Sequence, residues 1–105
     1  IGNSTVSETS GDVMGSSNGS ITLVGNIKMW FDTVTVPAGT SNEKELPLSS
    51  EFSKIWTVQV TDARPTTSSF LQVRGYVDQS QTTAIVNTNG SAESNVNVLI
   101  IGQAL

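Results

Sequence analysis

Three carboxylates, Glu43, Glu45 and Glu51, lie close enough in this sequence to suggest acid–base catalysis. A glycosidase needs such a pair, with one member buried so that a raised pKa lets it act as the general acid. The surrounding segment is rich in turn formers and shows no sign of burial, so we interpret all three as solvated charges. The chain contains no His and no Cys, which excludes Ser-His and Cys-His catalysis. We therefore predict no catalytic residue, no enzyme activity and no cofactor.

Metal ions and polyanions are also poorly matched by this composition. Asp62 and Asp78 have Ser and Thr oxygens nearby, but neither lies in a loop with calcium spacing. Because zinc ligands of the ordinary kind are absent as well, we predict no metal site. The net charge of −4 and the pI near 4.4 repel phosphate backbones, so nucleic acid is not an expected partner. No apolar run approaches the ~18 residues of a membrane span, and we expect no membrane insertion.

Aromatic and amide side chains suggest recognition of another surface instead. Phe70 and Tyr76 alternate with Gln72 and Arg74, which places all four on one face of a strand. Such a mixture suits either a subunit contact or a carbohydrate site, because Tyr and Arg are common in both kinds of contact. The residues alone leave these two alternatives open, with incidental exposure as the third.

The strands that position these side chains are organised around residues 20–36, where apolar and β-branched residues concentrate. A break at Gly25-Asn26 predicts a short strand before it and a longer strand after it. In the longer strand the apolar residues take odd positions up to Phe31 and even positions from Val34 onward. Such a swap of faces needs an extra residue, so we predict a β-bulge near Asp32-Thr33.

Later segments add further short strands. Pro47 confines residues 43–48 to an edge or to a short strand, since Pro cannot donate to a ladder. Residues 54–61 alternate with Trp56, Val58 and Val60 on one face, and we interpret both Trp residues as core or subunit-interface residues. Residues 94–103 are apolar on both faces near their end, which indicates a central strand.

Together these signals predict an all-β fold, an antiparallel β-sandwich of about six to eight short strands. At 105 residues the chain forms one domain. Residues 1–19 are rich in Ser, Gly, Asn and Thr without periodicity, and we interpret them as a linker. The sandwich is expected to span residues 20–105.

The order of these elements resembles the C-terminal tip domain of bacteriophage tail fibres. The stretch NGSITLVGNIKMWFDTVTVPAG is similar to that family's opening motif, and ELPLSSEFSKIWTVQVT is similar to its next segment. The closing strand NVNVLIIGQAL ends in the family's Ile-Gly dipeptide. The resemblance covers residues 18–105. Departures include Phe31-Asp32 where the family has a Gly after the Trp, and Leu46 where it has a Phe before the Pro.

This resemblance implies a homotrimeric receptor-binding domain at the distal tip of a tail fibre, part of the extracellular surface of a virion. Its partner would be a bacterial surface glycan, such as polysaccharide or lipopolysaccharide, or another outer-membrane receptor, bound during host adsorption. Residues 1–19 would be the end of the fibre shaft. Two alternatives stay open, a glycan-depolymerising module of a tailspike and a purely structural fibre cap.

Candidate residues follow for both surfaces of such a trimer. The low charge leaves more apolar surface than one small domain covers alone. The candidates for the trimer interface are Phe70, Tyr76, Leu99 and Ile101. For the receptor we expect the polar loops 62–69, 78–82 and 87–95, at least two of which should meet at one end of the sandwich. The receptor-binding candidates are Arg64, Tyr76, Gln81 and Asn89. The outer sheet face around Lys28 and Gln59 is the alternative location.

Overall fold

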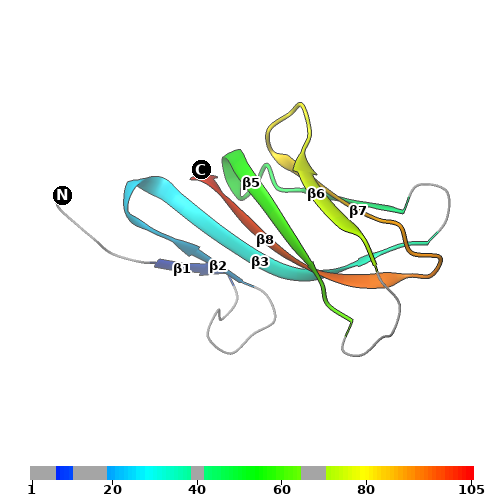
Figure 1. The fold of residues 1–105 in the computed structure, drawn as a ribbon. Helices are drawn as coiled ribbons and strands as arrows, with labels where there is room; N and C mark the ends of the chain where they lie inside the picture. The colour runs from blue at the N-terminus through cyan, green and yellow to red at the C-terminus, as the bar shows by residue number, and fades with distance from the viewer. Residues whose placement is uncertain (1–6, 11–18, 39–41, 65–70) are drawn as a thin grey trace.

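The computed structural model describes residues 7–10, 19–38, 42–64 and 71–105. Within these ranges the chain forms eight strands and one 3-10 turn: β1 Ser7–Ser10, β2 Gly19–Thr22, η1 Val24–Asn26, β3 Ile27–Val36, β4 Glu43–Pro47, β5 Phe52–Asp62, β6 Val73–Val77, β7 Thr83–Thr88 and β8 Ser94–Ala104. All pairs are antiparallel and form a five-stranded sheet, β1-β2-β3-β8-β5, and a three-stranded sheet, β4-β7-β6 (Figure 1). The predicted all-β sandwich is confirmed. The described part contains no helix long and apolar enough to cross a membrane.

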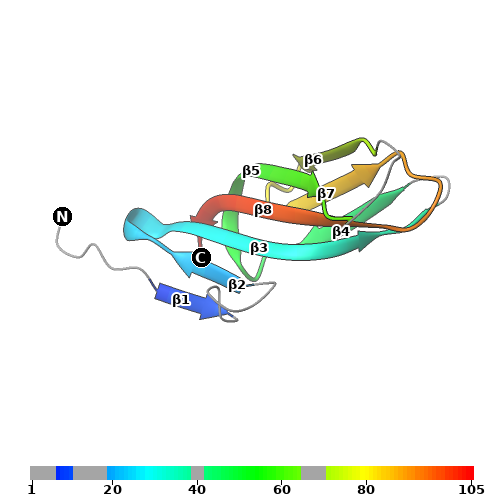
Figure 2. The same cartoon turned by 60° about the horizontal axis from the view of Figure 1, so that its bottom comes forward.

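The smaller sheet covers only part of the larger one. In Figures 1 and 2, β4, β6 and β7 lie over β5, β8 and the C-terminal half of β3, whereas β1 and β2 extend beyond the sandwich. The core between the sheets consists of Val34, Val36, Leu46, Leu48, Phe52, Ile55, Ala84, Val86, Val96, Val98 and Ile100. As predicted, β8 is central, between β3 and β5, and β4 with its terminal Pro47 is an edge strand.

The central stretch contains the predicted break but not the predicted bulge. Gly25 has φ +79° and Asn26 has φ +62°, the left-handed conformation that these two residue types tolerate best. From there β3 pairs with β8 without interruption, from Ile27 opposite Gln103 to Val36 opposite Ser94. The prediction of a β-bulge near Asp32-Thr33 is therefore wrong. Even positions face the core along the whole strand, so the odd apolar residues lie on the outer face.

The two Trp residues differ in burial. Trp30 packs against the core from β3. Trp56 is 49% exposed, although Val58 and Val60 of the same strand do pack against the core. The register between β5 and β8 shifts beside Trp56, so the extra residue turns this side chain out of the alternation. The expectation that Trp56 shares the face of Val58 and Val60 is corrected by this bulge.

Lys28 is buried on the inner face of β3, with 6% of its surface exposed. Its Nζ donates to Glu51 Oε1 at 2.6 Å and to the Glu51 carbonyl oxygen at 3.2 Å. The ammonium also lies 5.6 Å from the centroid of the Phe52 ring. This position corrects the expectation that Lys28 lies on the outer sheet face. Only Gln59 of that alternative site is exposed there.

Two glycines let neighbouring strands approach closely. A Cβ on Gly75 would lie 2.7 Å from Val58 Cγ1, so the missing side chain makes room for this close neighbour. A Cβ on Gly102 would overlap the carbonyl oxygen of Lys54. Both contacts join β5 to its neighbours, Gly75 across the two sheets and Gly102 within one sheet.

Part of the N-terminal segment joins the larger sheet. Strand β1 pairs with β2, with Ser7 opposite Thr22. The Ser and Thr residues of this segment offer no hydrophobic alternation, so its sequence indicates no strand. The other residues between 1 and 18 lie outside the described ranges.

Candidate functional site

Polar loops meet at one end of the sandwich. Arg64 follows β5, Leu71 precedes β6 and Asn89 follows β7, and all three line a cavity of about 370 Å³ together with residues 90–94. As expected, segments from two of the three polar loops converge here. The part of the first loop between residues 65 and 69 lies outside the described ranges.

Arg64 is held in place by Asp62. Its Nε donates to Asp62 Oδ1 at 2.9 Å and its Nη2 to Oδ2 at 2.6 Å, while its backbone N–H donates to Oδ1 at 3.0 Å. These hydrogen bonds lower the pKa of Asp62, and the carboxylate raises the pKa of Arg64. Because both side chains are partly exposed, the pair fixes the Arg64 side chain but contributes little to the stability of the fold. A ligand at Arg64 would share its guanidinium with Asp62.

The other two receptor candidates lie elsewhere. Gln81 is in the turn between β6 and β7, where its carbonyl oxygen accepts from Ile55 N at 2.7 Å. Since β6 and β7 form a hairpin, this turn is at the opposite end of β7 from Asn89. Tyr76 lies within β6 and is 39% exposed. Its side chain is on the side of the three-stranded sheet that faces away from the core. Arg64 and Asn89 thus share a cavity that Gln81 and Tyr76 do not line.

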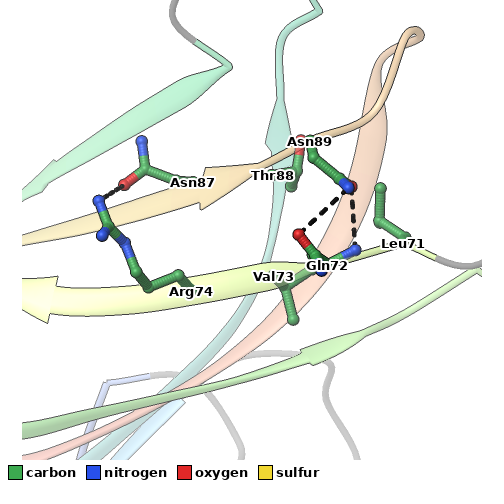
Figure 3. A pocket seen from close by; sticks show the side chains of 7 residues that line it. All are labelled: Leu71, Gln72, Val73, Arg74, Asn87, Thr88 and Asn89. Carbon is green, nitrogen blue, oxygen red and sulfur yellow. Dashed lines mark hydrogen bonds between the residues drawn. The ribbon is translucent and has the colours of Figure 1, made fainter.

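A larger cavity, of about 700 Å³, lies on the three-stranded sheet and is called the β6–β7 groove here (Figure 3). It is lined by Leu71, Gln72, Val73, Arg74, Asn87, Thr88 and Asn89. Two polar cross-strand pairs span it. Arg74 Nη2 donates to Asn87 Oδ1 at 3.3 Å, and the backbone N–H of Gln72 donates to Asn89 Oδ1 at 2.9 Å. Asn89 Nδ2 donates back to Gln72 Oε1 at 3.4 Å.

Further contacts extend from the Arg74–Asn87 pair, across the sheet to β4 and along β6. Asn87 Nδ2 donates to Glu43 Oε1 at 3.3 Å, and the Arg74 guanidinium lies 4.9 Å from the centroid of the Tyr76 ring. Sequence reasoning noticed the face of Gln72, Arg74 and Tyr76 but missed Asn87. The signal that identifies Asn87 is register, because β6–β7 pairing places it directly opposite Arg74.

The outer face of the five-stranded sheet has a different character. Ile21, Met29, Phe31, Leu99 and Ile101 all face outward there and are partly exposed. No outward-facing residue of β3 or β8 is charged. Two hydrogen-bonded pairs border this apolar area, Thr33 with Asn97 at 2.7 Å and Thr35 with Asn95 at 2.9 Å. We call this surface the outer face below.

The described candidates for the trimer interface lie on two different surfaces of the sandwich. Leu99 and Ile101 lie on the outer face, in adjacent outward positions of β8. Tyr76 is on the opposite side of the sandwich, on the three-stranded sheet. Phe70 lies outside the described residues. Leu99 and Tyr76 therefore belong to two different surfaces of one subunit, because the two sheets separate them.

The chain is similar to known proteins in its fold but not detectably in its sequence. No family model and no curated protein sequence matches the chain. A C-terminal fragment of the R2 pyocin fibre of P. aeruginosa superposes with a TM-score of 0.69 and 12% identity, over 94% of this chain and 26% of that one. An N-truncated R2-type pyocin tail fibre superposes with a TM-score of 0.64 and 14% identity, over 94% of this chain and 38% of that one.

The chain therefore spans well under half of either pyocin fibre chain that it matches. At such low sequence identity, the likeness concerns the course of the backbone and not the identity of surface residues. It agrees with the fold that the resemblance to tail-fibre tip domains implies. This chain has the fold of a segment of pyocin tail fibres.

Proposed function

We propose that this chain is a tail-fibre domain of a phage or phage-like particle, located at the distal tip, that binds a receptor on a bacterial surface. The observation that carries the proposal is the fold shared with two pyocin tail fibres over 94% of the chain. Exposed amide-rich cavities on the sandwich supply surfaces on which a receptor could be bound.

The contacts of the carboxylates favour binding over catalysis. Glu51 is paired with Lys28, Glu43 accepts a hydrogen bond from Asn87, and Glu45 is exposed. A glycosidase would need two of them to face one another across a substrate groove. This arrangement supports a receptor-binding domain over the glycan-depolymerising alternative.

The labelled chain is expected to bind intact cells of at least one strain in a bacterial panel that includes P. aeruginosa. Flow cytometry on intact cells, and on cells stripped of surface polysaccharide, measures the binding and its dependence on glycan. Heat-unfolded chain is the control for non-specific adhesion. Release of reducing ends from purified capsule or lipopolysaccharide would favour the enzyme instead. Absence of binding to every strain would favour a structural cap.

We also propose that the domain is a homotrimer and that the outer face is its subunit contact. Its apolar centre, its lack of charge on β3 and β8 and its hydrogen-bonded polar border match the composition of subunit interfaces. Leu99 and Ile101 belong to this contact, whereas Tyr76 is assigned to the receptor side.

Leu99→Asp is expected to convert the trimer to a monomer, because three carboxylates would be buried without partners at the contact. Light scattering at micromolar concentration should give three times the chain mass of 11.1 kDa for wild type and the single mass for the variant. Tyr76→Asp is the control and should stay trimeric. A monomeric wild-type chain contradicts the trimer, and a trimeric Leu99→Asp variant contradicts the choice of face.

A further inference from the structure

We infer that the β6–β7 groove is a binding site for an uncharged sugar. This inference rests on the proposed function, in which the domain binds a bacterial surface receptor, and it names the chemical class of the group recognised. The groove shares Leu71 and Asn89 with the loop cavity at Arg64, but it extends from there along β6 and β7, where Arg74 is paired with Asn87.

The spacing of the polar pairs suits a ring with several hydroxyls. Gln72 immediately precedes β6, and Arg74 is the second residue of β6. Extended chain rises about 3.3 Å per residue, so the two polar pairs are separated by about 7 Å. Figure 3 shows the Arg74–Asn87 pair at one end of the groove and the Gln72–Asn89 pair at the other. Leu71, only 9% exposed, adds apolar wall beside the Gln72–Asn89 pair, whereas Val73 packs against the core between the sheets. Few, fixed polar groups beside an apolar wall are typical of small-ligand sites.

The groove has hydrogen-bonding capacity beyond its internal bonds. A guanidinium carries five N–H donors, and within the described residues Arg74 uses only Nη2, toward Asn87. The Gln72 Nε2 amide donates no hydrogen bond within the same part of the structure. Sugar hydroxyls both donate and accept, so they can use the guanidinium and amide donors together with the amide oxygens.

The charges near the groove favour a neutral ligand. Glu43 bonds to Asn87, and Glu45 lies two residues further along the same strand. These two carboxylates outnumber the guanidinium of Arg74, and the chain as a whole carries −4. An acidic sugar would meet like charge at short range, which reduces its affinity relative to a neutral one. Tyr76 does not line the groove, but its ring lies 4.9 Å from the Arg74 guanidinium and helps to hold that side chain in place.

The test is a titration of the full chain followed by ¹H–¹⁵N spectra of its side-chain amides. The probes are the methyl glycosides of glucose, galactose, mannose and rhamnose, with glucuronate as the acidic comparator. At least one neutral glycoside should shift the amide signals of Gln72, Asn87 and Asn89 saturably, and more strongly than glucuronate does. The amides of Asn95 and Asn97, on the outer face, are the control within each spectrum.

Variants separate binding from structure. Arg74→Gln and Asn87→Ala should each weaken binding of the responsive glycoside at least about fivefold, the loss expected for one hydrogen bond. Their unfolding midpoints should change little, since Arg74 is exposed and Asn87 partly exposed. Lys54→Gln removes an exposed cation from the other sheet and should bind as wild type does. Gln72→Ala is the second variant if Asn87→Ala fails to fold.

Two results would overturn the inference. In the first, no neutral glycoside shifts the groove amides more than it shifts those of Asn95 and Asn97. In the second, glucuronate binds as tightly as the neutral glycoside that binds best. The cell assay distinguishes failure of this inference from failure of the proposed function. If wild type and Arg74→Gln bind cells equally well, the groove is not the receptor site while the proposed function stands. If wild type binds no cells, the proposed function fails, and the titration still decides whether the groove binds sugar.

Discussion

Replacing Gly102 by Ala is expected to destabilise the domain by about 3 kcal/mol or more, the upper part of the range for overpacked cores. A Cβ at this position would overlap the Lys54 carbonyl oxygen and lie 2.9 Å from Ile55 Cα and 3.0 Å from Phe52 Cδ1. Two of these three atoms belong to the backbone of β5, where its register against β8 shifts. Rotation of one side chain cannot relieve the contact, so the backbone itself must move.

Urea unfolding followed by Trp fluorescence measures this loss, at one fixed protein concentration because the stability of an oligomer depends on concentration. Gly75→Ala is the matched control. Its Cβ would meet only side-chain atoms of Val58 and Val60 at 2.7 and 2.9 Å, which can shift, so about 1 to 2 kcal/mol is expected. A Gly102→Ala variant as stable as Gly75→Ala would show that β5 yields easily at its bulge.

Local chemistry explains which parts of the fold could be predicted. The turn at Gly25-Asn26 follows from the left-handed conformation that these residues tolerate, and the edge position of β4 follows from the missing N–H of Pro47. The inner face of β3 could not be predicted in this way. Phe31 and Val34 make both faces apolar, and which face is buried depends on the sheet that packs against it.

Prediction of the candidate site was limited in a similar way, because it depends on the register between strands. The expectation that at least two of the three polar loops meet at one end agrees with the cavity lined by Arg64 and Asn89. The same expectation did not place Gln81 apart from them, although a hairpin turn must lie opposite the loop that leaves its second strand. The Arg74–Asn87 pair depends on which residue faces which across β6 and β7, and the sequence contains no signal strong enough to fix that pairing.

Replacing Glu51 by Ala is expected to cost about 2 kcal/mol, whereas Lys28→Met should cost less than about 1 kcal/mol. Without Glu51, the partners that the Lys28 ammonium keeps among the described residues are a carbonyl oxygen at 3.2 Å and the Phe52 ring at 5.6 Å, in a buried position. An uncompensated buried charge is more costly than an apolar chain of similar length in its place. We expect less than the full cost of a deeply buried charge because the Glu51 side chain is 29% exposed, so water can reach the pair.

The double variant Lys28→Met/Glu51→Ala distinguishes the two sources of this effect. If the loss in Glu51→Ala comes from the unpaired ammonium, the double variant should be nearly as stable as Lys28→Met in urea unfolding, and more stable than Glu51→Ala. If the ion pair itself stabilises the fold, Lys28→Met alone should be as unstable as Glu51→Ala, and the double variant should recover nothing. The first pattern is expected, because a Met side chain can pack against Phe52 without the desolvation that the ammonium requires.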